Sequence, residues 1–277
     1  MNKDAWRELD GTGEPAAVTA ALEGRLPKDF DQWDILDTKG RPVARTALFY
    51  GHLPDTFTNW ALSSGDGISI GHCAAILGRL PFGYSDWDIR DKNRSTVAHY
   101  AAMHGNLPAD FLKWDLADDN GTTVAHFMAK YGKLPVNFEE WWLSDNMGWS
   151  VAHERVKWKE LPHGFSMWEI SDKFDWTVAH EAVLHKKLPL PVDGELLDLK
   201  TVDGLSLAHL CARMGFLPED YDQWEMCNDN GWTVAHEAAK YGHTRLLPVD
   251  LNFFDDMGVS VRDLRESIPM TVNNVTK

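Results

Sequence analysis

The chain is poor in cysteine, in basic residues and in long apolar segments. Its three cysteines, Cys73, Cys211 and Cys227, are odd in number and show no Cys-x-x-Cys spacing, so we expect reduced thiols rather than disulfides or a zinc knuckle. No apolar run approaches the roughly 18 residues that a membrane-spanning helix needs, and residues 1–10 are charged rather than signal-like. These absences predict a cytoplasmic protein that does not enter a membrane.

Basic residues are outnumbered, with 27 lysines and arginines against 42 acidic residues and a formal net charge of −15. Nucleic acids and anionic membranes attract positively charged surfaces, so we expect no direct binding to either. A hydrophobic content of 44% is ample for a buried core, which argues against a chain disordered throughout. The charge favours a soluble chain whose partners are basic or mixed in charge.

Three landmarks recur along the chain, mostly with a period of 27 residues. The first is the dipeptide Leu-Pro, which begins at Leu26, Leu53, Leu80, Leu107, Leu134, Leu161, Leu188, Leu217 and Leu247. The second is a histidine, at His72, His99, His126, His153, His180, His209 and His236. The third lies six residues beyond a proline, at Trp33, Trp60, Trp87, Trp114, Trp141, Trp168, Leu197, Trp224 and Phe254. A fixed period of this length is typical of stacked repeats, and we expect the tryptophans of the third set in the core.

Each period predicts two short helices and a turn. Residues 233–241 begin with an N-cap hydroxyl, continue with alanine-rich helix formers and end before Gly242, which suits a helix C-terminus. The residue two places after the proline favours N-cap positions, as Asp110 does, so a second helix is expected there, with Phe111 and Trp114 on one face. Residues 118–121 then have the pattern of a type I turn. Such short helices are marginal alone and must stack.

The repeated segments resemble a known family. Residues 231–242, Gly-Trp-Thr-Val-Ala-His-Glu-Ala-Ala-Lys-Tyr-Gly, and the related residues 121–132 are similar to the Gly-x-Thr-Pro-Leu-His-x-Ala-Ala-x-x-Gly signature of ankyrin repeats. The resemblance covers about residues 38–265. It implies an all-α, ankyrin-like solenoid of stacked helix-turn-helix repeats, with Val-Ala in place of Pro-Leu and a shorter second helix. We expect an N-terminal capping unit at 1–37, a repeat array at 38–254 and a C-terminal capping unit and tail at 255–277.

The repeated histidines do not predict a metal site, a cofactor or a catalytic residue. Each repeat supplies one histidine, and packed helices lie roughly 8–10 Å apart, too far for one zinc ion with bonds of about 2 Å. His180 and His185 are five residues apart, whereas two ligands on one helix face need a separation of four. We instead expect each imidazole to hydrogen-bond to backbone in its own or the next turn, and no enzymatic activity.

A variable position just after the turn is the first candidate for binding another protein. It holds Trp149, Trp176, Leu205 and Trp232, whereas the neighbouring positions vary little: mostly glycine precedes it, and serine or threonine follows it. The ankyrin resemblance implies that these side chains lie at the base of the finger and face the concave surface. The alternative is that each tryptophan lies flat over its own turn and shields backbone.

A second variable set lies at the end of the first helix and includes Tyr131, Trp158, Met214 and Tyr241. Aromatic residues, methionine and arginine are enriched in protein interfaces. Exposed in a row, they typically mark a contact surface. The sequence therefore predicts a scaffold that binds a partner protein through the concave and finger surface, in an oligomeric state that the sequence leaves open.

Acidic residues form two further columns, which leave a second functional reading open. One column follows the core aromatic position, at Asp34, Asp88, Asp115, Glu169, Asp198 and Glu225. The other begins the turns, at Asp37, Asp91, Asp118, Asp145 and Asp172. They are explained by a solvated outer face and by turn formation. In the alternative reading, the acidic array imitates a nucleic-acid backbone and inhibits a nucleic-acid-binding protein.

Overall fold

The computed structural model describes residues 3–132, 134–187, 194–248 and 252–267. Within these ranges every regular element is helical, and extended backbone pairs only in isolated bridges. The chain divides into two compact units. Unit 1 comprises Met1–Phe138 and Leu143–Asn146, and unit 2 comprises Glu139–Trp142 and Met147–Lys277. The boundaries predicted for the capping units concern another division of the chain and stay predictions.

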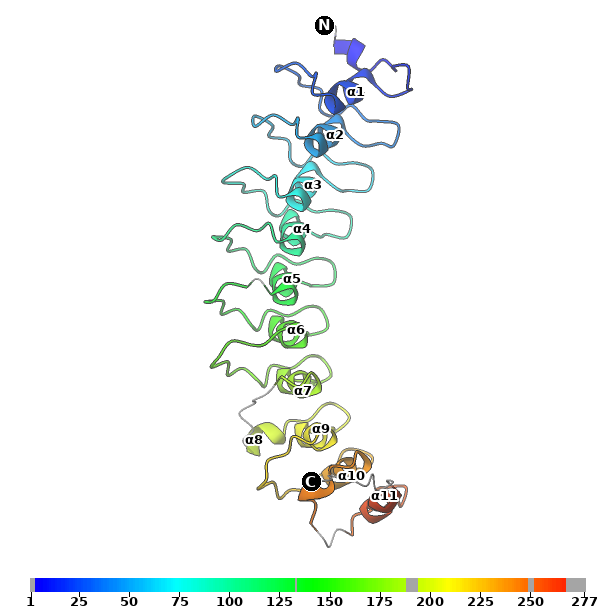
Figure 1. Ribbon diagram of the computed structural model, residues 1–277, viewed down its shortest axis with the longest axis vertical. Coiled ribbons are helices and arrows are strands. Elements are labelled where there is room, and N and C mark those ends of the chain that lie inside the picture. Colours follow the sequence, from blue (N-terminus) through cyan, green and yellow to red (C-terminus); the bar gives the residue numbers. More distant parts are fainter. Residues whose placement is uncertain (1–2, 133, 188–193, 249–251, 268–277) are drawn as a thin grey trace, which may run out of the picture. The chain divides into compact units, whose positions relative to one another are not determined.

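Short α-helices follow one another at regular intervals in each unit (Figure 1). Unit 1 contains η1 (Lys3–Trp6), α1 (Ala16–Leu22), α2 (Val43–Tyr50), α3 (Ile70–Leu77), α4 (Val97–His104) and α5 (Val124–Tyr131). Unit 2 contains α6 (Val151–Trp158), α7 (Val178–Leu184), α8 (Gly194–Leu197), α9 (Leu207–Met214), α10 (Val234–Lys240), η2 (Thr244–Leu246) and α11 (Val261–Ser267). None of the helices in the described ranges has the length and apolar character needed to cross a bilayer.

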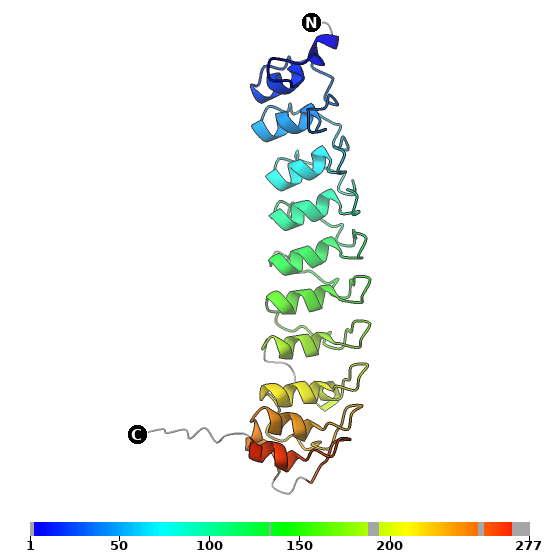
Figure 2. The ribbon, with the colours of Figure 1, turned by 90° about the vertical axis from the view of Figure 1, so that its right-hand side faces the viewer.

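Consecutive helices pack side by side within each unit. In unit 1 each of α1 to α4 contacts the next helix, and in unit 2 the contacts run from α6 to α7, α9, α10 and α11 in turn. Figure 2 shows these helices from the side, with the connecting turns projecting beyond one end of each helix. The expectation of an all-helical chain with sequential helix contacts is confirmed.

Four of the repeat helices, α3, α4, α5 and α9, begin after a serine or threonine and end before a glycine, as the sequence indicated. Helix α4, for example, begins after the N-cap Thr96 and ends before Gly105, whose φ of 73° is left-handed. Such a conformation favours glycine, because a Cβ is strained there. The third helical residue, His99, completes a capping box in which the Thr96 hydroxyl accepts from the His99 backbone N–H and the imidazole accepts from the Thr96 backbone N–H.

The predicted second helix of each pair is wrong for the described repeats. Only α8 forms in such a segment, and it has four residues. Elsewhere the chain makes single turns; after α4, Phe111 N donates to Pro108 O at 3.2 Å. The residue two places after the proline therefore serves a turn instead of an N-cap.

The backbone of this segment has another role, which explains why it does not become helical. The first N–H groups of a helix have no partner inside the helix. In α5 these groups find partners in the preceding segment, because Val124 N donates to Leu116 O at 2.9 Å and Ala125 N donates to Trp114 O at 3.2 Å. In a helix over residues 110–116 these two carbonyl groups would point along the helix axis instead of toward the next helix.

The aromatic residues of these segments form a packed row. In unit 1, Phe111 and Trp114 are 5.1 Å apart between ring centroids and lie edge to face, and similar contacts connect neighbouring repeats. The prediction of core tryptophans is confirmed where the ring is buried, at Trp87, Trp114, Trp141 and Trp224. In the two irregular repeats the same position is buried at Leu197 and 63% exposed at Phe254. The short helix η2 displaces the last Leu-Pro pair, although the turn residues Asn228 and Asp255 keep the 27-residue spacing.

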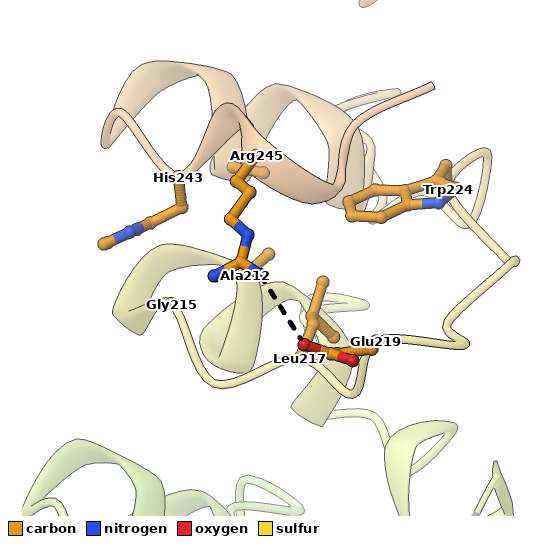
Figure 3. Close-up of a pocket in the computed structure, with 8 residues that line it drawn as sticks. Ala212, Gly215, Leu217, Glu219, Trp224, His243 and Arg245 are labelled. Carbon is orange, nitrogen blue, oxygen red and sulfur yellow. Dashed lines mark ion pairs between the residues drawn. The ribbon is translucent and has the colours of Figure 1, made fainter.

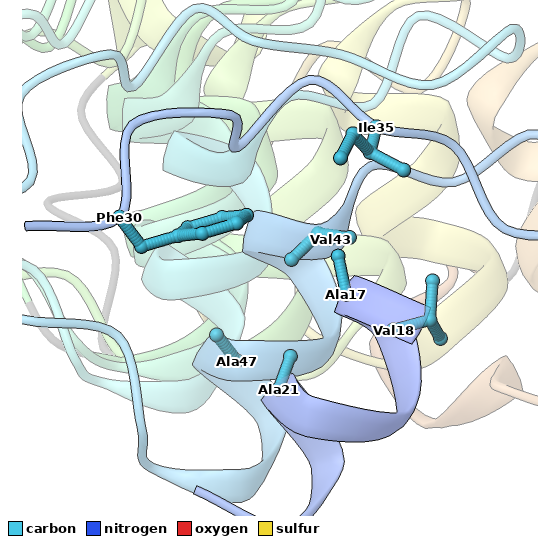
Figure 4. Packing of buried hydrophobic residues seen from close by; sticks show 7 residues of the cluster. All are labelled: Ala17, Val18, Ala21, Phe30, Ile35, Val43 and Ala47. Atoms are coloured by element: carbon cyan, nitrogen blue, oxygen red, sulfur yellow. The ribbon is translucent and has the colours of Figure 1, made fainter. Parts of the chain in front are cut away.

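Small residues of adjacent helices and apolar residues of the loops make the core between repeats. Figure 4 shows one such cluster in unit 1, where Ala17 and Ala21 of α1 face Val43 and Ala47 of α2. Phe30, from the loop between these helices, closes the cluster and is 8% exposed. Alanine on the facing sides allows the two helices to approach closely.

The turns also stack on one another through backbone contacts. In unit 1, Asn146 N donates to Asn120 O in the preceding turn at 2.9 Å. Gly121, with a φ of +76°, lies beside this contact, and a Cβ there would be 2.7 Å from Asn146 N. Glycine is required here by both its left-handed backbone and the close approach of the next turn.

Candidate partner-binding surface

The repeated histidines are fixed by hydrogen bonds on both ring nitrogens. Nδ1 of His99 accepts the backbone N–H of Thr96 at 3.0 Å, so Nε2 carries the proton and donates it to Thr122 O in the next repeat at 3.0 Å. The corresponding Nε2 contacts are His72 with Ser95 O, His153 with Trp176 O, His209 with Trp232 O and His236 with Val259 O. This confirms the predicted role of the imidazoles in binding backbone.

These imidazoles are held neutral. Burial lowers the pKa of His99 in the folded chain, because the charged form loses its hydration. Within the described ranges, no group of three or more histidine, cysteine, aspartate or glutamate side chains is placed to hold a metal ion. The cysteines are free: Cys73 and Cys211 are buried and Cys227 is exposed.

His180 departs from this pattern. Its Nδ1 is engaged by Thr177 as in the other repeats, but its buried Nε2 has no hydrogen-bond partner. The following repeat is longer, so the corresponding carbonyl belongs to Leu205, two residues further along the chain than in the other repeats. Burial lowers the pKa of His180 to about 4, although the nearby Leu205 carbonyl opposes the shift.

The three tryptophans of the variable position cover the histidines of their own repeats. Ring centroids are 4.7 Å apart for Trp149 and His153, with the planes tilted by 32°. The other two pairs repeat this arrangement, Trp176 with His180 at 5.1 Å and Trp232 with His236 at 4.9 Å. All three tryptophans are partly buried. Each ring thus lies against the first turn of its own helix and keeps part of its surface exposed.

A glutamate accompanies each of these tryptophans, and our reading of the sequence missed it. Trp149 Nε1 donates to Glu154 at 3.2 Å, and Trp176 Nε1 donates to Glu181 at 3.0 Å. An indole N–H requires such a partner when the ring is largely buried. The sequence does contain a signal: a glutamate follows by five residues at Trp149, Trp176 and Trp232, whereas Leu210 stands in that place after Leu205.

The tryptophan and glutamate of α6 extend into a larger cluster. Trp158, at the last residue of the helix and 48% exposed, donates its indole N–H to the other carboxylate oxygen of Glu154 at 2.8 Å. Glu154 therefore bridges two indole rings. The ammonium of Lys157 lies 5.5 Å from the Trp149 ring centroid and 6.0 Å from that of Trp158. The structure brings together two predicted site residues, Trp149 and Trp158, around one carboxylate and one cation.

A second cluster of the same kind lies on α10. Lys240 Nζ is 5.2 Å from the Trp232 ring and 5.8 Å from the ring of Tyr241, which is 46% exposed. Here the carboxylate of Glu237 accepts two hydrogen bonds from Arg213 of α9, at 3.1 and 2.8 Å. The cluster therefore joins two predicted site residues, Trp232 and Tyr241, with an ion pair that connects neighbouring helices.

The remaining predicted site residues join neither cluster. Leu205 precedes the N-cap of α9, Met214 is the last residue of that helix, and both are partly buried. Trp176 stands over α7, where Glu181 also contacts His185 at 2.9 Å. Tyr131 belongs to unit 1, at the end of α5, is 41% exposed and lies 6.0 Å from Lys130 Nζ.

A hollow of about 300 Å³ lies elsewhere in unit 2, between the loops that follow α9 and α10 (Figure 3). Trp224 lines one side of it, and Arg245 forms an ion pair with Glu219 across it at 3.8 Å. Both partners are almost fully exposed, so the pair contributes little. The hollow contains none of the predicted site residues and has the form of a groove between repeats.

No protein-family model matches this chain, and no curated protein is significantly similar to it. The resemblance to ankyrin repeats therefore rests on the repeated residue pattern.

Proposed function

We propose that this chain is a non-enzymatic protein-recognition scaffold, an ankyrin-like solenoid whose second helix is reduced to turns. The partner binds the surface of unit 2 formed by Trp149, Trp158, Trp176, Trp232 and Tyr241, which we call the tryptophan face. The observation that carries the proposal is that three repeats of this unit hold a partly exposed tryptophan in the same fixed orientation.

Fixed aromatic rings suit recognition for a physical reason. Binding must overcome the entropy lost when side chains become ordered at an interface. The rings of Trp149 and Trp176 are already held by an imidazole on one side and by a carboxylate at the indole nitrogen. A partner therefore gains contact area without ordering these rings, which is how tryptophan and tyrosine act as binding hot spots.

The histidine geometry supports the non-enzymatic part of the proposal. A general acid or base needs a ring nitrogen within reach of the substrate. Both nitrogens of His99 and of His209 are engaged by backbone and by the N-cap residue. The repeated imidazoles are thus structural groups that connect one repeat to the next.

The turn carboxylates argue against extending the proposal to an electrostatic decoy. Oδ1 of Asp118 accepts the backbone N–H groups of Asn120 and Thr122, both at 2.9 Å. Asp172 makes the same pair of contacts in its own turn. These contacts support a role in turn formation for the acidic column that begins the turns, and we do not propose inhibition of a nucleic-acid-binding protein.

The test is quantitative capture of partners by the tagged full chain from its native cell. In one variant Trp149, Trp176 and Trp232 are replaced together by leucine, the residue that α9 carries naturally at this position as Leu205. The matched control is Trp142→Leu, which removes a 53% exposed tryptophan that is not on the tryptophan face. We expect the triple variant to lose the captured protein and the control to keep it. Equal capture by both would refute the proposal.

A further inference from the structure

Two clusters on the tryptophan face already hold a lysine ammonium between aromatic rings. On α6, Lys157 Nζ lies 5.5 and 6.0 Å from the Trp149 and Trp158 ring centroids. These distances are within the range of about 6 Å over which an aromatic face attracts a cation. Lys157 is exposed, and no ion pair connects it to any residue in the described ranges. Its ammonium is therefore held at this place by the two rings.

The rings do not depend on Lys157 for their positions. Glu154 accepts the indole N–H of Trp149 at 3.2 Å and that of Trp158 at 2.8 Å, one on each carboxylate oxygen. His153 supports the other side of the Trp149 ring. The two indole rings and the negative charge between them thus remain in place if the lysine side chain moves away.

We infer that the α6 cluster is a binding site for the side-chain ammonium of a lysine in the partner protein, which displaces Lys157. The chemistry of the site is an alkylammonium between two indole rings, close to a carboxylate. The displacement is easy because Lys157 reaches the rings through an exposed, flexible four-carbon chain. The assignment of this ammonium to a partner protein rests on the proposed function, whereas binding of an ammonium compound can be measured alone.

Two other helices of unit 2 carry related groups, and we expect them to bind an ammonium less well than α6. The α10 cluster has two rings around Lys240, but its carboxylate, Glu237, is neutralised by Arg213, whose guanidinium also lies 5.5 Å from the Tyr241 ring. We therefore expect weaker binding there. On α7, Trp176 has a glutamate but His185 replaces the second large ring, so this tryptophan is an internal control.

The experiment uses indole N–H resonances of the full chain, assigned with single Trp→Phe variants. The probe is Nα-acetyl-lysinamide, and the matched neutral compound is Nα-acetyl-norleucinamide, which has the aliphatic chain without the ammonium. We expect the lysine compound to shift Trp149 and Trp158 in a saturable way, with Trp176 unaffected. In Lys157→Ala the affinity should rise about two- to five-fold, because a competing contact of roughly 0.5–1 kcal/mol is removed.

Several results would overturn the inference. One is an equal response to the norleucine compound, which would indicate apolar contact alone. Others are no response in Lys157→Ala, or an equal response of Trp176. An unchanged Trp224 resonance, from a buried ring in unit 2, verifies that the variant is folded. The two proposals fail separately. If the ammonium does not bind but the triple leucine variant loses capture, only this inference is wrong. If the ammonium binds but the triple leucine variant keeps capture, only the proposed function is wrong.

Discussion

The repeats of units 1 and 2 share the same buried histidine but cover it with different aromatic rings. In unit 1 the covering ring comes from the next helix: Tyr100 lies 4.8 Å from His72, and Phe127 lies 5.3 Å from His99. In unit 2 the ring comes from the repeat's own turn, as with Trp149 over His153. One structural requirement therefore has two solutions in one chain.

The difference shows how a repeat can present an aromatic ring near its surface while its histidine keeps the same hydrogen bonds. When the turn supplies the ring, the position after the next histidine no longer has to cover an imidazole. In unit 2 the turn before α6 supplies Trp149, and the position after the next histidine is Glu181, whereas in unit 1 the corresponding positions hold Tyr100 and Phe127. The exchange moves an aromatic ring from the contact between helices to a partly exposed place at the end of its own helix.

Acid should destabilise both units together, which is the largest effect we expect. Burial lowers the pKa of these histidines below the ordinary value of 6.5: His72, His99, His180, His209 and His236. Below pH 6.5 the unfolded chain binds protons that the folded chain does not, so the free energy of unfolding is fully present above this pH and falls as the pH approaches the folded-state values. At pH 5 His180, with a pKa of about 4, alone accounts for about 2 kcal/mol.

Urea unfolding followed by far-UV circular dichroism between pH 7.5 and 4.5 measures this loss. Carboxylates act in a separate window: hydrogen bonds from Thr12 and Thr19 lower the pKa of Asp10 to about 2, so its contribution disappears only below its ordinary value of 3.8. Urea midpoints that stay constant from pH 6.5 to 4.5 would show that the imidazoles are not held neutral, and the shared frame of the two units would be wrong.

Removing one histidine should cost more in unit 1 than at the irregular repeat of unit 2. His99→Ala leaves the buried Thr96 N–H without a partner, at about 1–3 kcal/mol, and removes one of the two hydrogen bonds that the Thr122 carbonyl accepts, the other coming from Asp118 N at 3.1 Å. His180→Ala removes only the contact with Thr177, because its Nε2 has no partner. We expect losses of about 4 and 2 kcal/mol in the free energy of unfolding. Equal shifts of the urea midpoint would show that the forward hydrogen bond contributes nothing.

Much of the frame could be predicted from the sequence, because its determinants lie within one repeat. The cap at Thr233, the helix after it and the glycine at 242 are neighbours in the chain, so their pattern can be read locally. The second helix could not be judged in this way. Asp110 suits both an N-cap and a turn, and the choice depends on carbonyl groups at 114 and 116 that the next helix uses.

The candidate site was predictable only in part, for a similar reason. Variation between repeats identified the positions of Trp149 and Trp158, but their spacing of nine residues does not show that both indoles meet at Glu154. Nor does the sequence of one repeat show which ring covers a histidine. In unit 1 the contact between His72 and Tyr100 joins two repeats, and it depends on how the helices stack.

Exchanging the covering rings tests the comparison directly. Tyr100→Leu removes the edge-to-face contact with His72 and a 2.9 Å hydrogen bond from the phenol to Asp91, so we expect a loss of about 2 kcal/mol. Trp176→Leu should lose about 1 kcal/mol, because α9 already accommodates Leu205 at this position. Thermal unfolding of both variants is the measurement, and Tyr100→Phe isolates the hydroxyl group. A larger loss for Trp176→Leu would show that this tryptophan is primarily a structural residue.

The smallest effect should come from Glu154→Gln. The amide keeps one oxygen for the two indole N–H groups, and Glu154 is only partly buried, so we expect the free energy of unfolding to fall by about 0.5 kcal/mol or less. The mobility of the two rings should change more than the stability, because one carbonyl oxygen cannot accept both indole N–H groups in their present positions. Relaxation of the two indole N–H groups measures this order, with Glu181→Gln and Trp176 as the comparison on α7. A loss above about 2 kcal/mol in the free energy of unfolding, with unchanged mobility of the two rings, would show that Glu154 is a structural residue of the repeat. A carboxylate that only positions surface rings should restrict their motion and add little to stability.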